Sequence, residues 1–394
     1  MAFEPEALPG RVVVWDIGKT LAKLSLWDAH GRLLAQRSRT HPQREHAGLR
    51  VLDVEGIERR AVEVLREFAQ SGPVAALVPV AHGAAAALLR GDALAHPVLD
   101  YEDGIPETVR RDYESRRDAF AHSGSPRLPD GLNLGAQLFR LQRMQAVPFD
   151  DPSLRIVPWP QFWAWRLCGV AASEVSSLGC HSDLWNPYES QPSALARTQG
   201  WATRLAPLRR AGDVLGTLSP EWAERTGLSP ALAVHCGVHD SNAALYGARG
   251  FAEIGDGEAT VLSTGTWFVA MRSVTPATLA QLSLDEARDC LINVDVDGRP
   301  VPSARFMGGR EIERLARIDL PEIQHAMLDA LPRVVADQAL ALPTWAHGVG
   351  PYPRAHGRWI AQPRDAAGIA ATVALYAALV SDVLLEQIGS RASV

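Results

Sequence analysis

The chain opens with an apolar run that climbs to a carboxylate and a glycine turn, and an alternating run follows. Residues 12–17 read VVVWDI, and Gly18-Lys19-Thr20 comes next. From Lys23 to Trp27 the side chains alternate with a period of two, which is typical of a strand and not of a helix. Asp28–Gly31 predicts a turn and Arg32–Arg39 a third strand. The pattern predicts a meander with Gly18–Thr20 at the tip of its first hairpin.

Strand and helix patterns then alternate up to about residue 247. Apolar residues recur on one face of Val54–Gln70, and Ser71-Gly72-Pro73 ends that helix. Asp240 is expected at the N-cap of the last helix in this part. The other predicted strands are Val74–Val80, Ala84–Leu89 and Leu232–Cys236, and the other predicted helices are Glu107–Phe120, Leu132–Gln145, a segment that ends at Leu167, and Asp240–Gly247.

The opening pattern returns in the last third of the chain. Thr260–Leu262 predicts a strand, Ser263–Thr266 a loop, and Trp267–Met271 a returning strand. A strand, glycine loop and strand thus occur at Gly18 and again at Gly265. An internal near-repeat at this distance predicts two similar domains, which we place at 1–247 and 248–394. Ligands are then expected in the cleft between them.

The Gly18-Lys19-Thr20 turn is not a Walker-type phosphate loop. Such a loop needs a glycine five residues before its second glycine, and Val13 occupies that position. It must also open into a helix, whereas a strand pattern follows here. Two interpretations remain for the turn. It offers backbone N–H groups to an anion beside the Asp16 carboxylate, or it is an ordinary glycine turn.

Composition narrows the class of protein. The chain has 394 residues, 47% apolar residues and a net charge of −6, which fits two or three domains and argues against nucleic acid as the main partner. The four cysteines form no CxxC pair, so a reducing cytoplasm is expected. No signal peptide is apparent. Charged residues interrupt the apolar stretch Ala366–Ile388, which predicts a buried or amphipathic helix and no membrane span.

The candidate chemistry is phosphoryl transfer. That reaction needs donors for phosphate oxygens, a metal to neutralise them, and a base near the attacking hydroxyl. Asp16 and Asp240 are carboxylates that follow strand patterns at glycine loops. Gly18–Thr20 and Thr264–Thr266 are the two loops that would donate to phosphates.

Four motifs, in this order, resemble those of the FGGY carbohydrate kinases: DIGKT, GVHDSNAALYGA, VLSTGTWFVAM and FMGGREIE. The resemblance covers nearly the whole chain, and the His239-Asp240 pair is most similar to L-fuculose and L-rhamnulose kinases. It implies an α/β fold of two ribonuclease H-like (actin-like ATPase) domains. Each would be a five-stranded type of mixed sheet with flanking helices. The implied activity is ATP-dependent phosphorylation of a ketose, with Mg²⁺.

The resemblance also implies roles for individual residues. Asp240 would be the general base, and Asp16 together with Asp240 would hold the metal. The residues implied for phosphates and nucleotide are Gly18, Lys19, Thr20, Gly265, Thr266, Gly308 and Gly309. The residues implied for the sugar are His82, Gly83 and His239.

Each role has a structural alternative. Asp240 could serve only as a helix cap, and His82 and His239 could be structural histidines bonded to backbone carbonyls. Lys19 could be a solvated surface lysine, and Gly308-Gly309 could only shape a turn. The acidic stretch Asp100–Asp103 departs from the usual sugar-contacting segment, which leaves the substrate open.

The chain departs from the family pattern at its C-terminal end. Members carry a glycine-rich adenosine motif near the C-terminus, whereas this chain stops at Val394 where another strand is expected. The chain is therefore either truncated or has lost part of its nucleotide site. The alternative function is a non-catalytic sugar or nucleotide sensor of the same fold. A homodimer is one oligomeric state that the chain could form.

Overall fold

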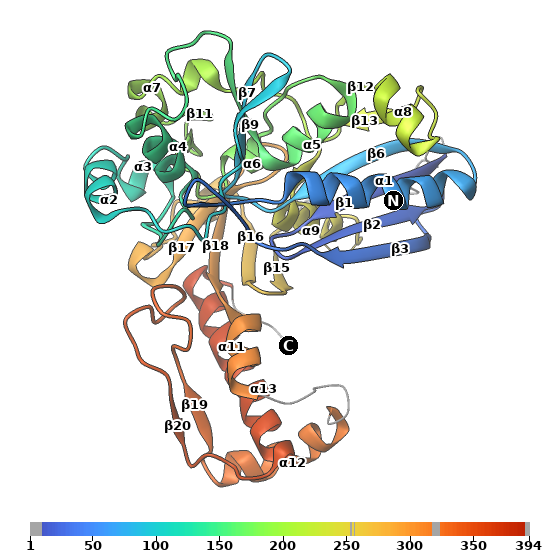
Figure 1. Cartoon of the computed structure of the whole chain (residues 1–394). Helices are drawn as coiled ribbons and strands as arrows, with labels where there is room; N and C mark the ends of the chain where they lie inside the picture. The colour runs from blue at the N-terminus through green and yellow to red at the C-terminus, as the bar shows by residue number, and fades with distance from the viewer. Residues whose placement is uncertain (1–9, 253, 256, 317–323, 391–394) are drawn as a thin grey trace. The chain divides into compact units, whose positions relative to one another are not determined.

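A computed structural model of the chain describes residues 10–252, 254–255, 257–316 and 324–390. The chain folds as two compact units. Their bounds are Met1–Gly255 with Ile292–Pro300 for the first and Asp256–Leu291 with Val301–Val394 for the second. Both are α/β, as expected (Figure 1).

The central sheet of the first unit has the strand order β12-β13-β6-β1-β2-β3. β1 (Arg11–Ile17) pairs antiparallel with β2 (Leu21–Trp27), and β2 pairs antiparallel with β3 (Leu33–Thr40). The predicted meander with a glycine turn at its first tip is confirmed. On its other side β1 pairs in parallel with β6 (Val74–Ala81), which puts the carboxyl ends of these two strands at one edge.

Two short strands pair with β6 on the side away from β1. β13 (Ala233–His235) and β14 (Val238–His239) both pair in parallel with β6, at Ala76–Leu77 and at Val80–Ala81. They therefore act as one strand interrupted at Gly237, whose φ is +82°. Counted in this way the described sheet has the five expected strands, and β12 (Val214–Thr217) is added antiparallel at the edge.

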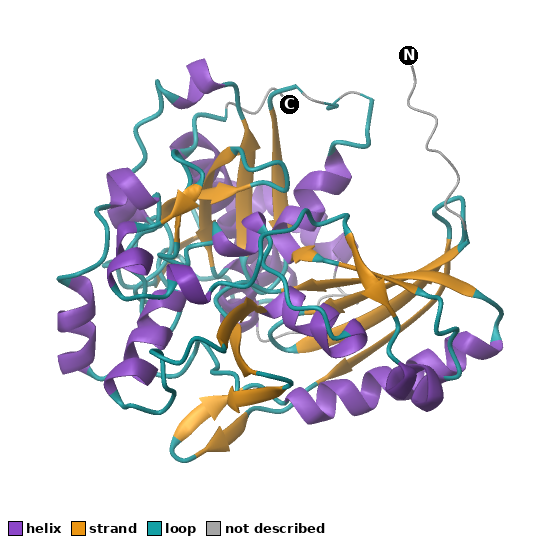
Figure 2. Ribbon diagram, turned by 90° about the horizontal axis from the view of Figure 1, so that it is seen from above, coloured by secondary structure: helices purple, strands orange, loops and turns teal. Residues whose placement is uncertain are grey.

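Helix α1 (Val54–Gln70) lies across one face of this sheet, with the bounds that its apolar periodicity predicts (Figure 1). In the view of Figure 2 the long helix again runs beside the strands. Trp15 on β1 is fully buried, and its ring centroid lies 4.6 Å from that of Trp163 on α5 (Trp159–Cys168). Because side chains alternate along a strand, Asp16 points to the opposite face from Trp15.

The remaining elements of the first unit surround this core. They include a three-stranded sheet in the order β8-β7-β9 and two short strand pairs. Their bounds are β4 (Arg44–His46), β5 (Leu49–Val51), β7 (Ala86–Arg90), β8 (Ala93–His96), β9 (Leu154–Pro158), β10 (Trp185–Asn186), β11 (Gln191–Pro192), α2 (Glu107–Glu114), α3 (Phe120–Ser123), α4 (Leu134–Arg143), α6 (Val175–Leu178), α7 (Ala194–Thr198), η1 (Ala202–Arg204), α8 (Pro220–Thr226) and α9 (Asp240–Ala248).

Another described sheet has the order β15-β16-β18-β17, one strand short of the expected number, and the division of the chain into units falls within β17 and β18. β15 and β16 form an antiparallel hairpin around Gly265, as expected from the repeated pattern. The bounds are β15 (Ala259–Thr264), β16 (Phe268–Ser273), α10 (Pro276–Leu279), η2 (Glu286–Arg288), β17 (Cys290–Val294), β18 (Pro300–Phe306), α11 (Gly308–Ala316), α12 (Gln324–Ala336), β19 (Leu340–Leu342), β20 (Arg358–Ile360) and α13 (Ala366–Gln387).

Helix α13 is the core helix of the second unit. Among the described residues it is the one helix long and apolar enough to cross a membrane. More than half of its most apolar stretch is buried inside the fold, however, where Val373, Tyr376 and Leu384 join the core. This burial agrees with the expected buried helix.

Two sequence-based predictions are wrong in detail. The helix predicted over Glu107–Phe120 ends at Glu114, and the chain turns before α3. Asp240 is the first residue of α9, and His239 holds the N-cap position. The Asp240 carboxylate instead accepts a hydrogen bond from Ser241 N at 2.6 Å.

Candidate active site

Three parallel strands of the first unit end together. Ile17 on β1 pairs with Ala81 on β6, and Ala81 pairs with His239 on β14. The residues that follow these positions are Gly18, His82 and Asp240. In α/β sheets, ligands bind in the crevice outside the carboxyl ends of such strands. The structure therefore brings the Gly18 turn, the sequence-predicted histidines and the predicted base to one edge of the sheet.

Asp16 and Asp240 influence each other electrostatically across this edge. Partial burial raises the pKa of Asp16, Lys23 opposes that shift, and the nearby Asp240 carboxylate raises it further. Lys23, the register partner of Asp16 on β2, places its Nζ 2.9 Å from Asp16 Oδ2. The two carboxylate side chains remain 30% and 36% exposed, so both are open to a ligand.

His239 is buried beside the predicted base and is held from three sides. Its Nε2 lies 3.2 Å from Asp240 Oδ1 and 3.2 Å from Cys180 Sγ. Its Nδ1 lies 3.2 Å from Asn242 Nδ2. Because an amide nitrogen only donates, Nδ1 accepts and the ring proton resides on Nε2. Burial lowers the pKa of His239, so the ring is neutral near pH 7, with its Nε2 close to both Cys180 Sγ and Asp240 Oδ1.

His82 has one bonded and one unbonded ring nitrogen. Its Nδ1 donates to Gly83 O at 2.7 Å, which leaves Nε2 as an acceptor. Nε2 is buried and has no hydrogen-bond partner among the described residues. Burial lowers the pKa of His82 to about 4, so the ring is neutral near pH 7. A buried acceptor without a partner costs free energy, and a ligand hydroxyl would satisfy it.

Gly83 leaves no room for a side chain. A Cβ at this position would lie 2.8 Å from Cys180 Sγ and 3.1 Å from His239 Nε2. The glycine is therefore needed for the close approach of the loop to the histidine, independently of any contact with a ligand.

Lys19 is not the solvated lysine of the structural alternative. Its ammonium group forms an ion pair with Asp100 and lies 3.8 Å from Glu102 Oε2. It also lies 5.3 Å from the centroid of the Tyr101 ring, and its side chain is 13% exposed. The Gly18 turn is thus tied to the acidic stretch that sequence analysis left open.

The second unit brings its own predicted residues together. Gly265 N donates to Trp267 O at 3.1 Å at the tip of the β15–β16 hairpin. A Cβ on Gly309 would lie 2.3 Å from Gly265 O and 3.0 Å from Thr266 Cα. A Cβ on Gly308 would lie 2.5 Å from the Phe268 ring. The start of α11 can approach the hairpin tip only because both residues are glycines.

Comparisons with known proteins show the family to which the chain belongs. The family model described as "Carbohydrate kinase FGGY, C-terminal domain" matches residues 256–394. The solved structure of a carbohydrate kinase from Novosphingobium aromaticivorans is 54% identical in sequence. The match covers 97% of this chain and 82% of that chain, with a TM-score of 0.86. The chain belongs to the FGGY carbohydrate kinases.

More distant FGGY kinases share the fold. A ligand-bound xylulose kinase from Lactobacillus acidophilus matches 96% of this chain and 78% of its own, with 16% identity and a TM-score of 0.76. A glycerol kinase from Plasmodium falciparum with ADP matches 96% and 80%, with 12% identity and a TM-score of 0.75. No curated protein sequence matches the chain. This FGGY kinase is a sugar-phosphorylating enzyme with the two-domain actin-like ATPase fold.

The carboxylates of this FGGY kinase suit magnesium and not a protein-built metal cage. Within the described ranges no group of three or more His, Cys, Asp or Glu side chains is arranged to hold a metal. Mg²⁺ typically keeps several waters and uses one or two carboxylates together with substrate phosphates. Asp16 and Asp240 are two partly exposed carboxylates, and the charge of Asp240 contributes to the raised pKa of Asp16, which fits that donor set.

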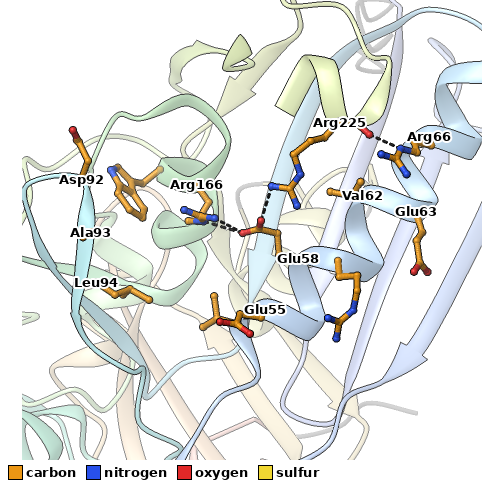
Figure 3. A pocket seen from close by; sticks show the side chains of 13 residues that line it. Glu55, Glu58, Val62, Glu63, Arg66, Asp92, Ala93, Leu94, Arg166 and Arg225 are labelled. Carbon is orange, nitrogen blue, oxygen red and sulfur yellow. Dashed lines mark hydrogen bonds and ion pairs between the residues drawn. The ribbon is translucent and has the colours of Figure 1, made fainter. Parts of the chain in front are cut away.

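A larger cavity of this FGGY kinase lies away from these residues. It has a volume of about 730 Å³ and lies along the outer side of α1 (Figure 3). In Figure 3, Arg166 and Arg225 both point to Glu58, which they hold at 2.5 Å and 2.6 Å. Glu58 is thus balanced by two arginines, and none of the sequence-predicted site residues lines this cavity.

Sequence reasoning missed two residues of the site. Cys180 and Asn242 both contact His239, and neither had been singled out. Asn242 lies on α9, three residues after His239 at the N-cap of that helix, so its spacing was a usable signal. Cys180 is 59 residues away in the chain and comes close only through the fold.

Proposed function

We propose that this kinase transfers the γ-phosphate of ATP to a hydroxyl group of a ketose of the L-fuculose, L-rhamnulose or pentulose type. The hydroxyl oxygen attacks the γ-phosphorus, the bond to the β-phosphate oxygen breaks, and ADP leaves. Asp240 accepts the hydroxyl proton as the phosphoryl group transfers. The chain would act in the cytoplasm.

The observation that carries this proposal is the close approach of His239 to Asp240 at the strand edge. His239 Nε2 lies 3.2 Å from Asp240 Oδ1, and Asn242 fixes the proton on that nitrogen. The neutral ring therefore lies beside the carboxylate without forming a full ion pair with it. Asp240 Oδ1 accepts a hydrogen bond from Ser241 N at 2.6 Å, and Oδ2 is left to face the substrate hydroxyl.

The sugar is expected beside His82, Gly83 and His239. The unbonded Nε2 of His82 would accept a hydrogen bond from a sugar hydroxyl. The sequence resemblance of the His239-Asp240 pair to L-fuculose and L-rhamnulose kinases supports a ketose. Because a xylulose kinase is among the structural relatives, pentuloses are included among the sugars to be tested.

Phosphates and nucleotide are assigned to the glycine loops. The transferred phosphate would be bound by Gly18, Lys19 and Thr20. The ion pair with Asp100 would hold the Lys19 side chain in position there. In the second unit, Gly265 and Thr266 with Gly308 and Gly309 would serve the nucleotide. Asp16 and Asp240 would hold Mg²⁺, which neutralises phosphate oxygens during transfer.

The test is a coupled ADP-release assay with L-fuculose, L-rhamnulose, L- and D-ribulose and D-xylulose, in parallel with calorimetry of sugar binding. We expect sugar-dependent ADP release from one or more of these sugars. Asp240→Asn should reduce turnover by roughly a thousandfold or more while sugar binding survives. Asp213→Asn, at a loop carboxylate outside the site, is the matched control.

Three results would contradict the proposal. Near-normal turnover of Asp240→Asn would show that another group is the base. Sugar binding without ADP release in the unaltered protein would favour the sensor. ADP release that ignores the sugar would indicate an ATPase.

A further inference from the structure

A second, smaller cavity in the first unit has four arginines among the eleven residues that line it. Its volume is about 230 Å³, and it lies between the first turns of α1 and the ends of β2 and β3. It is lined by Ala22, Arg39, Thr40, His41, Pro42, Arg44, Asp53, Gly56, Ile57, Arg59 and Arg60. We propose that this arginine pocket binds a small phosphate-bearing anion at a site separate from the active site.

The charge of the arginine pocket is strongly positive. Four arginines and a single carboxylate, Asp53, are among the residues that line it. Burial lowers the pKa of His41, so that ring adds no charge near pH 7. Arginine presents a planar fork of donors that matches phosphate oxygens, and it stays charged at every physiological pH. The pocket is therefore built for an anion and not for a neutral sugar.

Two of the four arginines already have acidic partners. Arg44 Nε lies 3.2 Å from Asp53 Oδ1, and Arg60 Nη1 lies 2.9 Å from Glu63 Oε2. Asp53 is further engaged because it accepts from Gly56 N at 3.2 Å as the cap of α1. These pairs hold the walls of the pocket in place.

The other two arginines supply the binding charge. Within the part of the chain that the structure describes, Arg39 and Arg59 form no ion pair or hydrogen bond through their side chains. The charges of Arg39 and Arg59 both contribute to lowering the pKa of Glu63, but Glu63 accepts its hydrogen bond from Arg60. Arg39 on β3 and Arg59 on α1 thus approach the cavity from two elements and can grip one anion together.

Size limits the ligand. Pockets for drug-sized ligands measure roughly 300–1,000 Å³, so about 230 Å³ suits a smaller molecule. Inorganic phosphate or a short phosphate ester fits this volume, whereas a nucleoside triphosphate does not. A bidentate arginine–phosphate contact supplies both energy and geometry.

The arginine pocket also touches the first phosphate loop. His41, in its wall, donates from Nε2 to Gly18 O at 3.0 Å, and His41 N donates to Thr20 O at 3.1 Å. An anion held beside His41 would restrain the Gly18–Thr20 turn from behind. This coupling rests on the proposed function of that turn; the binding site itself does not.

Calorimetry with inorganic phosphate tests the site directly, at constant ionic strength with chloride as the exchanged anion. We expect saturable binding to the unaltered chain. The double variant Arg39→Gln/Arg59→Gln should bind phosphate more weakly, with a dissociation constant raised by roughly tenfold or more. The control Arg32→Gln/Arg37→Gln removes the same charge from exposed arginines outside the pocket and should change the constant less than about twofold.

Each outcome decides the proposal. Equal weakening in both double variants would reduce the effect to net charge, and unchanged affinity in the pocket variant would put phosphate elsewhere. Either result overturns the site, as would the absence of saturable binding. If the site holds, phosphate should alter sugar-dependent ADP release in the unaltered enzyme and not in the pocket variant. Phosphate binding is read without turnover, so its outcome is independent of the proposed function.

Discussion

Asn242 Nδ2 lies 3.2 Å from His239 Nδ1 and so determines which nitrogen of the imidazole carries the proton. With Nδ1 as acceptor, the proton sits on Nε2, 3.2 Å from Asp240 Oδ1. Asn242 thereby determines the tautomer of the ring that lies beside the proposed base. The chain of contacts runs from Asn242 through His239 to Asp240.

We predict that Asn242→Asp impairs turnover more than Asn242→Ala. An aspartate would accept from Nδ1–H, which reverses the tautomer and turns an Nε2 lone pair toward Asp240. We expect kcat to fall by about tenfold for the alanine and by roughly a hundredfold for the aspartate, with little change in the KM for ATP. Steady-state ADP release measures both, and Asn186→Ala, on β10, is the control. Equal losses for the two variants would contradict the tautomer assignment.

Gly83 should tolerate a methyl group only when Cys180 is shortened. The added Cβ would lie 2.8 Å from Cys180 Sγ, so Gly83→Ala should lower the free energy of unfolding by about 1–3 kcal/mol and displace His239. Replacing the sulfur in Gly83→Ala/Cys180→Ala should restore part of both stability and turnover. Denaturant unfolding and kinetics complete the double-mutant cycle. Gly212→Ala, where a Cβ meets nothing within 4 Å, is the control; additive effects in the cycle would argue against the contact.

Sequence patterns predicted correctly those elements whose periodicity and end residues lie within or directly beside the element. Val54–Gln70 was predicted with its observed bounds, because apolar periodicity and the Ser71-Gly72 stop coincide. The two glycine hairpins at Gly18 and Gly265 followed from period-two alternation on both sides. These positions depend on neighbours within a few residues, which a single sequence displays.

Contacts made by the fold itself were beyond sequence reasoning. The helix predicted over Glu107–Phe120 stops early because Arg117 turns inward to Asp183 at 2.9 Å and to Ser125 O at 2.6 Å. Likewise, Lys19 pairs with a carboxylate 81 residues away, which no local pattern reveals. Tertiary ion pairs of this kind override helix propensity and surface expectation.

In the second unit, Gly265 and Gly309 should respond differently to alanine. A Cβ on Gly265 meets only Trp267 O at 3.9 Å, so Gly265→Ala should fold normally and raise the KM for ATP if the loop receives phosphates. A Cβ on Gly309 would lie 2.3 Å from the Gly265 carbonyl, which is backbone and cannot give way. Gly309→Ala should therefore lower the melting temperature as well. Thermal unfolding with ATP titration distinguishes them, and an unchanged KM in Gly265→Ala would remove that loop from the nucleotide site.

Glu174 is a buried carboxyl group that makes stability depend on pH. It accepts from the backbone N–H of Ser176 and Ser177, at 3.0 Å and 3.1 Å, as the cap of α6. Burial nevertheless raises its pKa from 4.5 to about 7. Between these two values the folded chain holds a proton that the unfolded chain has released. The contribution of Glu174 to stability is therefore fully present below about pH 4.5 and is lost as the pH rises to 7.

We predict that this loss amounts to about 2–3 kcal/mol between pH 5 and 8, since one pKa unit corresponds to roughly 1.4 kcal/mol. Glu174→Gln cannot titrate, so the difference in unfolding free energy between the unaltered chain and the variant should shrink by that amount over the same range. Urea unfolding at pH 5, 6.5 and 8 measures it. Glu224→Gln, at an exposed position on α8, is the control and should follow the unaltered chain. A constant difference between the unaltered chain and Glu174→Gln would show that Glu174 is ionised throughout, held charged by its hydrogen bonds despite its burial.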